Sequence, residues 1–306
     1  MSEELIAELE IPGVLSIDRS VSDMPRLVIE SEQCSAELYL QGAHLTKWQP
    51  KGHEPVLFLS EKSVFAPGKA IRGGIPIIFP WFGARTATPF SSRTDGPSHG
   101  FARTADWQVE AATMKGGVLF LKLSLKPNEV SRSLGYDQFR LSYELELGQE
   151  LKLTLRTENL SDSAMQIEEA LHTYFAVGDV RQLSLDGLCG TDYLDKTDAM
   201  KRKRQSEPVL ALSGETDRPY LGSKTAVTIN DPTLKRRIIV EKQNSNTTVV
   251  WNPWSALSAK MSDMSADSWT HMVCVETANA LEDAVVIESG AVHTMTACIS
   301  LQESKS

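Results

Sequence analysis

The segment FRLSYELELGQELKLTLRTEN, residues 139–159, carries the most regular pattern in the chain. Apolar side chains occupy every second position from Phe139 to Leu147 and again from Leu151 to Leu155, on either side of Gly148-Gln149-Glu150. A period of two places alternate side chains on opposite faces of a strand, and one apolar face implies burial. We therefore predict an antiparallel hairpin whose apolar face lies in a core.

The same rhythm continues along the chain in both directions. The other predicted strands cover residues 27–30, 36–40, 45–48, 56–60, 75–79, 107–114, 118–125, 165–176, 183–187, 207–212, 225–230, 236–242, 247–252, 271–277, 284–288 and 293–301. Helical periodicity is scarce, and we expect no more than a helical turn in the acidic N-terminus and in Ser262–Asp267. Many short strands with few helices predict an all-β fold, here a large antiparallel β-sandwich.

Length and composition predict one domain. The chain has 306 residues, 41% of them hydrophobic, and contains neither a Ser/Gly/Pro-rich linker nor a shift in composition. An all-β sandwich reaches this size as one domain. We expect a single domain over residues 1–306, and a monomer, because no helix suited to an interface stands out.

The net charge and the cysteines limit which partners and which cell compartment we expect. The net charge is -9, from 40 acidic and 31 basic side chains, which argues against a nucleic-acid or membrane partner. The four cysteines form no CxxC pair, and Cys274 and Cys298 stand in apolar, strand-like runs typical of reduced core residues. The sequence starts without the basic and apolar regions of a signal peptide, and no apolar run reaches the length of a membrane span. We expect a soluble protein in a reducing, cytoplasmic compartment.

Several kinds of site lack support. None of the six histidines has metal-ligand spacing, and GxSxG, Walker A and GxGxxG motifs are missing. We therefore predict neither a metal nor a cofactor, and no hydrolase, NTPase or Rossmann fold.

His172 is the first candidate for a proton donor or acceptor. It stands in Ala170-Leu171-His172-Thr173-Tyr174-Phe175, where a strand would place His172 and Tyr174 on one face. On the local sequence alone, a half-buried histidine satisfied by a carbonyl group is the better interpretation.

Glu276 is the second candidate, at what we expect to be the end of an apolar strand. Partial desolvation there would raise the pKa of its carboxyl group and make it a better base at neutral pH. A solvated strand-end carboxylate, or one paired with a structural arginine, explains the local sequence equally well.

Two arginines could recognise an anion. Arg72 and Arg103 stand beside glycine-containing, loop-like sequence, where a guanidinium can bind a phosphate or carboxylate in a bidentate manner. For either one alone, a surface arginine is the commoner case.

The basic run Lys201–Arg204 is expected to be a solvated loop. Five aromatic residues near Pro or Gly could stack on sugars or pack in the core: Trp81, Phe82, Trp251, Trp254 and Trp269.

Taken together, five blocks resemble one known family. They are Arg72-Gly73-Gly74-Ile75-Pro76-Ile77-Ile78-Phe79-Pro80, His99-Gly100-Phe101-Ala102-Arg103, Leu171-His172-Thr173-Tyr174-Phe175, Val250-Trp251-Asn252-Pro253-Trp254 and Cys274-Val275-Glu276. In this order they resemble the glucose-6-phosphate 1-epimerases of the aldose 1-epimerase superfamily, over about residues 26–301.

The resemblance implies a β-supersandwich of the galactose-mutarotase type and interconversion of the anomers of a hexose 6-phosphate without a cofactor. It implies that His172 is the general acid and Glu276 the general base, with His172 protonated and Glu276 ionised near neutral pH. It implies that Arg72 and Arg103 bind the phosphate, and that Asp217 contacts the sugar.

The same resemblance places Ser98 and His99 among the substrate-binding residues, although Ser98 falls where family members often carry Gln. Asp179 matches a recurring acidic position to which we assign no role. Glu168 and Glu169 are expected to be structural. Two alternatives stay open at this point: a mutarotase for free aldoses such as galactose, and a sugar-binding protein that has lost turnover.

Overall fold

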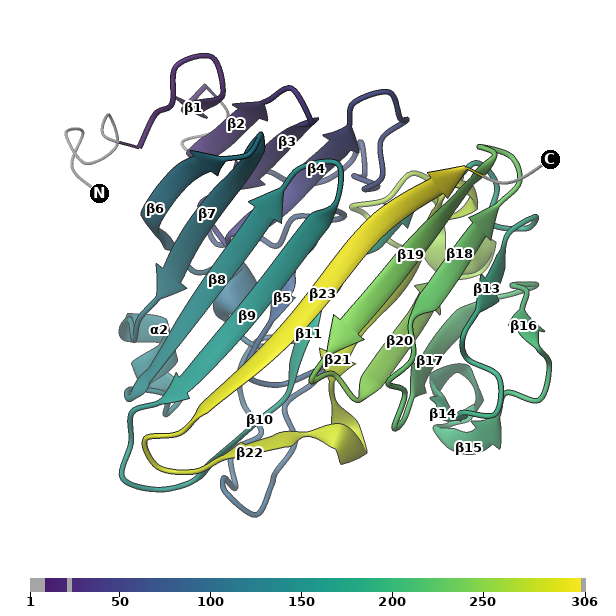
Figure 1. Cartoon of the computed structure of the whole chain (residues 1–306). Coiled ribbons are helices and arrows are strands. Elements are labelled where there is room, and N and C mark those ends of the chain that lie inside the picture. The colour runs from purple at the N-terminus through teal and green to yellow at the C-terminus, as the bar shows by residue number, and fades with distance from the viewer. Residues whose placement is uncertain (1–8, 21–23, 304–306) are drawn as a thin grey trace.

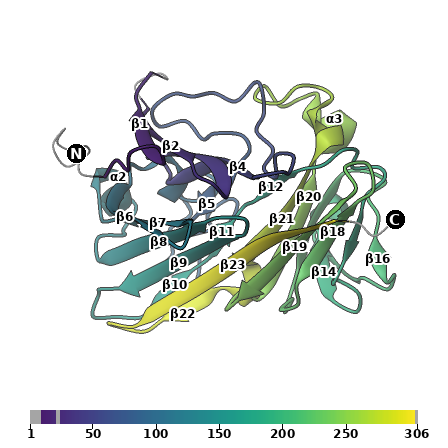
Figure 2. The same ribbon diagram turned by 45° about the horizontal axis from the view of Figure 1, so that its top comes forward.

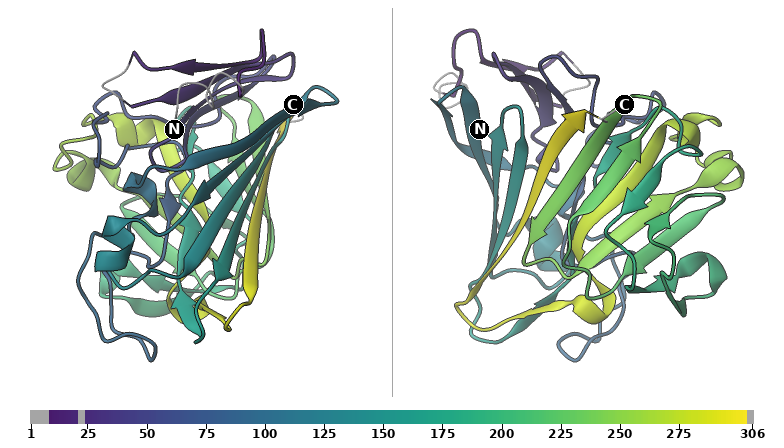
Figure 3. Two further views of the ribbon diagram at one scale, coloured as in Figure 1. Left: turned by 90° about the vertical axis from the view of Figure 1, so that its left-hand side faces the viewer. Right: turned by 45° about the vertical axis from the view of Figure 1, so that its right-hand side comes forward.

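The computed structural model describes residues 9–20 and 24–303, and it confirms the all-β antiparallel sandwich. Two large sheets pack face to face, as the side view in Figure 3 shows. The apolar core between them contains side chains from both sheets. In the part of the chain that the structure describes, no helix has the length and apolar character needed to cross a membrane.

The larger sheet has nine strands and faces the viewer in Figure 1. Its order is β16 (Val209–Leu210), β13 (Ser184–Asp186), β18 (Val227–Asp231), β19 (Arg236–Gln243), β23 (Val292–Glu303), β9 (Leu151–Asn159), β8 (Phe139–Leu147), β7 (Val118–Leu125) and β6 (Gln108–Lys115).

The second sheet has eight strands and lies behind the first in Figure 1. Its order is β15 (Lys201–Arg204), β14 (Asp192–Asp195), β17 (Thr216–Tyr220), β20 (Thr247–Asn252), β21 (Met272–Asn279), β11 (Glu169–Leu171) and β5 (Ile77–Ile78), with β12 (Tyr174–Ala176) also paired with β21.

The smaller elements complete the fold. A four-stranded sheet of β1 (Leu15–Asp18), β2 (Arg26–Glu30), β3 (Cys34–Tyr39) and β4 (His44–Pro50) lies across one end of the molecule (Figure 2). The others are β10 (Met165–Ile167) paired with β22 (Val285–Ile287), the helices α2 (Glu129–Ser133) and α3 (Trp254–Ser258), and the 3₁₀ turns η1 (Ala102–Thr104), η2 (Lys196–Asp198), η3 (Ser268–His271) and η4 (Leu281–Asp283).

The predicted hairpin is confirmed as β8 and β9. Leu147 pairs with Leu151 across the three-residue turn, and Leu151, Leu153 and Leu155 are fully buried. Burying one leucine side chain stabilises a fold by about 1.5–3 kcal/mol. The alternation therefore places one face of both strands in the core between the sheets.

Strand β21 is the element on which the site depends, because every one of its residues is buried. Val273 and Val275 point into the core between the two large sheets. Cys274 points the other way, into a separate apolar cluster with Tyr174. Since side chains alternate along a strand, Glu276 shares the face of Cys274, away from the larger sheet.

Some predicted elements were wrong in extent or kind. The single strand at 165–176 is three pieces, because the chain leaves the ladder at Glu168 and again at His172-Thr173. Residues 56–60 contribute only isolated bridges at Leu57 and Leu59. The basic run Lys201–Arg204 is the edge strand β15 and not a loop.

The helices also differ from the prediction. No helix forms over 262–267, and most of the acidic N-terminus lies outside the described residues. Helices α2 and α3 were not predicted, since one turn is too short to show a helical period. Local capping begins α2: Asn128 accepts from the backbone N–H of Ser131, and the Ser131 hydroxyl accepts from that of Asn128.

Candidate active site

His172 and Glu276 meet on the outer face of the eight-stranded sheet. His172 follows β11, which pairs with β21, and its Nε2 lies 3.3 Å from Oε1 of Glu276. Both residues are buried. Glu276 stands within β21, opposite Val249 of β20, and not at a strand end as predicted.

The imidazole of His172 is held by rings and by its own backbone. It stacks on Tyr174 with a centroid distance of 4.9 Å and an interplanar angle of 11°. The rings of Trp251 and His99 meet it edge-on, with centroid distances of 6.3 and 5.7 Å, and the backbone N–H donates to the carbonyl of Pro76. These contacts fix the ring orientation, so that Nε2 faces Glu276.

Each member of the pair keeps one polar atom without a partner among the described residues. These atoms are Nδ1 of His172 and Oε2 of Glu276, both buried. A buried polar atom without a hydrogen bond costs about 1–3 kcal/mol, so it calls for a functional explanation. A ligand with hydroxyl groups could satisfy such atoms.

Burial and neighbouring charges move the two pKa values in opposite directions. Burial, and secondarily the negative charge of Asp217, raises the pKa of Glu276 well above its usual value. Burial, together with His99, Arg103 and Arg72, lowers the pKa of His172 well below its usual value. Both shifts favour the neutral forms, a protonated Glu276 and an uncharged His172, whereas the predicted roles need Glu276 ionised and His172 protonated.

Arg72 and Arg103 form a cationic end beside His172. Gly73 and Gly74 follow Arg72 with φ values of 118° and 60°, and a Cβ at Gly73 would lie 2.5 Å from the carbonyl oxygen of Phe58. Only glycine permits this close passage, and it fixes the backbone that carries Arg72. Arg72 Nη1 donates to the Tyr174 hydroxyl at 2.9 Å.

Arg103 belongs to η1 and donates from Nη2 to the carbonyl of Ser98 at 2.8 Å. Ser98 is exposed and meets Arg103 through its backbone, so the predicted role of its side chain has no support from this contact. His99 lies between Phe82 and His172, and burial beside Arg103 and Lys196 lowers its pKa to about 3. It is therefore neutral at physiological pH.

The opposite end of the site holds Asp217 and a cation that was not predicted. Asp217 stands on β17 opposite Trp251 of β20, and its Oδ2 lies 2.9 Å from Nζ of Lys196. Burial raises the pKa of Asp217, and Lys196 opposes this shift. Lys196 also lies over the ring of Phe82, at 5.5 Å from its centroid. Nothing in the local sequence of Lys196 separates it from a surface lysine.

The basic run and Asp179 have structural contacts. The ion pairs of the run are Lys201–Asp198, Arg202–Glu282, Lys203–Asp195, Lys203–Asp198 and Arg204–Asp192. The pair with Glu282 joins β15 to η4, and the others hold β15 against β14 and η2, the turn that carries Lys196. Asp179 forms an ion pair with Arg181 within a surface turn.

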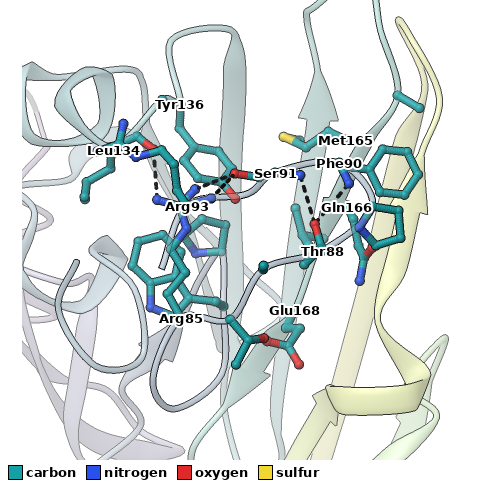
Figure 4. Close-up of a pocket in the computed structure, with 18 of the residues that line it drawn as sticks. Arg85, Thr88, Phe90, Ser91, Arg93, Leu134, Tyr136, Met165, Gln166 and Glu168 are labelled. Atoms are coloured by element: carbon teal, nitrogen blue, oxygen red, sulfur yellow. Dashed lines mark hydrogen bonds between the residues drawn. The ribbon is translucent and has the colours of Figure 1, made fainter. Parts of the chain in front are cut away.

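A separate hollow of about 780 Å³ lies beside the site, between residues 85–93, 134–139 and 161–168 (Figure 4). The residues that line it do not include His172 or Glu276. Trp81 is buried and the Arg85 guanidinium lies over its ring at 4.6 Å, so this ring is not free to stack on a sugar.

The predicted structural roles of Glu168 and Glu169 agree with their contacts. Glu168 stands between β10 and β11 and accepts from the backbone N–H groups of Phe82 and Leu281. These two hydrogen bonds hold the segments of Phe82 and Leu281 against the junction of the two strands. Glu169 is buried against His293 and Asn279. Neither carboxylate contacts the His172–Glu276 pair.

Comparison with known proteins shows the family of this chain. Residues 25–300 match the aldose 1-epimerase family. A protein of Escherichia coli strain K12 with the name "Putative glucose-6-phosphate 1-epimerase" is 35% identical, over 93% of this chain and 92% of its own length. A protein of the same name from Cenchrus ciliaris is 32% identical, over 89% and 83%. The crystal structure of a "putative mutarotase" from Salmonella typhimurium has a TM-score of 0.86 at 32% identity, with 96% of both chains covered. The chain belongs to the aldose 1-epimerase family.

Proposed function

We propose that this protein interconverts the α and β anomers of a hexose 6-phosphate, with D-glucose 6-phosphate as the first candidate. The observation that carries the proposal is the buried contact of His172 with Glu276 beside the cationic end formed by Arg72 and Arg103. The names of the relatives from Escherichia coli and Cenchrus ciliaris support the same substrate class.

The reaction needs one base and one acid, and no cofactor. The base takes the proton of the C1 hydroxyl while the acid protonates the ring oxygen, and the bond between C1 and that oxygen breaks. The aldehyde then rotates about the C1–C2 bond, and the same steps in reverse close the ring on the other face. The His172–Glu276 pair holds one proton before and after, so the proton count balances.

Substrate binding would move this proton to His172. Burial is the main cause of the lowered pKa of His172, and the charges of Arg103 and Arg72 lower it further. A phosphate dianion beside them offsets their charge, which raises the pKa of His172 toward its usual value. His172 is then the acid and Glu276 the base. Asp217, His99 and Ser98 are the proposed contacts to the sugar hydroxyls.

The test of this function is anomer exchange of glucose 6-phosphate, followed by NMR with the spontaneous rate subtracted. Each positioned acid or base contributes about 10²–10⁴-fold. We expect Glu276→Gln and His172→Asn each to reduce the enzymatic rate by that factor, and the surface variant Asp179→Asn to leave it unchanged. Undiminished exchange in either site variant contradicts the proposal.

Phosphate recognition gives a second prediction, which separates this substrate from a free aldose. Hydrogen bonds to a charged group are worth about 1.5–3 kcal/mol each. We expect Arg103→Ala to raise the KM for glucose 6-phosphate at least about ten-fold and not to slow the exchange of free glucose or galactose. Equal losses on phosphorylated and free sugars contradict the role of Arg103 and favour a mutarotase for free aldoses.

A further inference from the structure

We propose that Asp263 is a positioning residue for phosphate recognition: it holds the guanidinium of Arg72 so that its free edge faces the sugar site. Asp263 lies 191 residues beyond Arg72 in the chain, in the segment between α3 and η3. This inference rests on the proposed function, because it assigns the residue that prepares Arg72 for the substrate.

The hydrogen bonds of Arg72 leave one edge of its guanidinium available. Asp263 Oδ2 accepts from Nε at 3.0 Å and lies 2.9 Å from Nη2, while Tyr174 accepts from Nη1. A guanidinium has five N–H donors, so one N–H on each terminal nitrogen remains. Two such donors suit the oxygens of a phosphate. Asp263 and a phosphate can therefore occupy different edges of Arg72.

Asp263 is itself held in place from two sides. Its backbone carbonyl accepts from the Ser60 hydroxyl at 2.7 Å, and the next residue, Met264, is buried in the apolar cluster of Tyr174. The Ser63 hydroxyl accepts from the backbone N–H of Arg72 at 2.7 Å. Figure 2 shows the segment after α3 beside the loops that follow β4. A carboxylate anchored in this way can fix the side chain that it contacts.

The same contacts connect Asp263 to the reacting pair. Arg72 donates to the Tyr174 hydroxyl, and the Tyr174 ring stacks on His172 at 4.9 Å. The chain Asp263–Arg72–Tyr174–His172 thus sets the distance between the phosphate end and the acid. A hexose 6-phosphate has to contact the phosphate end and the acid at the same time. Loss of the Asp263 contact would leave the Arg72 side chain mobile, and this should weaken binding of the phosphate.

If Asp263 instead acts only as a negative charge beside the phosphate, its removal should change the phosphate affinity in the opposite direction. An aspartate beside a phosphate site repels the dianion, so simple electrostatics predict that Asp263→Asn binds phosphate more tightly. Positioning predicts weaker binding, because Arg72 then has to be immobilised by the ligand. Immobilising one long side chain costs a factor of about 3 to 10 in affinity. The direction of the change therefore decides between the two roles.

The experiment measures the Kd of inorganic phosphate by calorimetry and the KM of glucose 6-phosphate for wild type, Asp263→Asn, Arg72→Ala and the double variant. Asp267→Asn is the matched control, since it removes the same charge from an exposed position in the same segment. We expect both constants to rise about 3- to 10-fold in Asp263→Asn. They should stay unchanged in Asp267→Asn, and Asp263→Asn should add no further loss to Arg72→Ala.

Each other outcome overturns the proposal. Tighter phosphate binding by Asp263→Asn makes Asp263 a competing anion, and an equal loss in the Arg72→Ala background shows that it acts by another route. Unchanged phosphate binding removes the role altogether. The phosphate measurement does not depend on turnover, so failure of the wild type to exchange anomers overturns the proposed function and leaves this test standing.

Discussion

Two charged side chains act on Glu276 in opposite directions, beyond the effect of its burial. Asp217 raises the pKa of the Glu276 carboxyl group and Lys196 lowers it. The His172–Glu276 pair works while it holds one proton, and it loses this proton as the pH rises through the pKa of Glu276. The alkaline limb of the pH profile therefore reports on the balance between Asp217 and Lys196.

This balance gives a prediction with two opposite signs. Lys196→Met removes the group that lowers the pKa of Glu276, so the alkaline limb of kcat/KM should move to higher pH. Asp217→Asn removes a group that raises this pKa, so the limb should move to lower pH. Lys196 and Asp217 also contact each other, so a substitution of one can affect Glu276 through the other. Shifts of the same sign in both variants would contradict separate actions of the two residues on Glu276. The measurement is anomer exchange across the pH range, with the spontaneous rate subtracted at each pH.

The sequence indicated titratable residues that stand among apolar neighbours. It missed residues whose role depends on a contact with a distant part of the chain. His172 and Glu276 stand in apolar stretches of sequence where a titratable group is conspicuous, although only the resemblance to a family assigned them the roles of acid and base. Lys196 and Asp263 stand in polar turns, and only contacts with Asp217 and Arg72 give them a role. Those contacts join positions far apart in the chain, which no local pattern can show.

At the scale of elements, the segment between Arg72 and β5 depends on glycine. A Cβ at Gly73 would meet the backbone of Phe58 and Leu59 at 2.5 and 2.6 Å, and its φ of 118° disfavours other residues. The same segment presents Arg72 on one side and the Pro76 carbonyl that accepts from His172 on the other. Its shape therefore supports both the phosphate end and the acid.

We expect Gly73→Ala to lower the free energy of unfolding by about 3–5 kcal/mol, since strain and a backbone clash act together. Gly52→Ala is the matched control, because Gly52 also has a positive φ of 83° but has open space around its Cα. Backbone strain alone should cost that control about 1–2 kcal/mol. Urea unfolding measures both variants. Equal losses would show that the close passage beside Phe58 does not constrain this segment.

Strand prediction succeeded where burial is regular and failed where pairing changes partner. Strands β8 and β9 bury one face throughout, so period two is clean. The stretch 165–176 pairs first with β22, through β10, and then with β21, through both β11 and β12, and the ladder is interrupted at Glu168 and at His172-Thr173. The register on β21 is the same before and after the second interruption, so position 172 falls opposite position 276, and His172 lies beside Glu276. The edge strand β15 was missed because its side chains are mostly exposed and charged.

At the scale of the whole molecule, the small sheet β1–β4 shares its core with the sandwich. Trp48 of β4 is fully buried, and its Nε1 donates to the carbonyl of Gly148 in the β8–β9 turn. Gln33 donates to the carbonyl of Gly116 in the β6–β7 turn. We propose on these grounds that the chain folds as the single domain expected from its composition. A monomeric state stays a prediction that sedimentation can test.

A single cooperative unit predicts how the molecule unfolds. Far-ultraviolet circular dichroism reports on all the sheets, whereas tryptophan fluorescence reports on particular positions such as Trp48. Both signals should follow one transition in urea. Trp48→Ala removes a large buried side chain, which costs about 3–5 kcal/mol. Since Trp48 contacts the β8–β9 turn, this loss should shift the whole transition to lower urea. If β1–β4 were independent, the same substitution would unfold that sheet first and split the transition in two, with the sandwich retaining the wild-type midpoint.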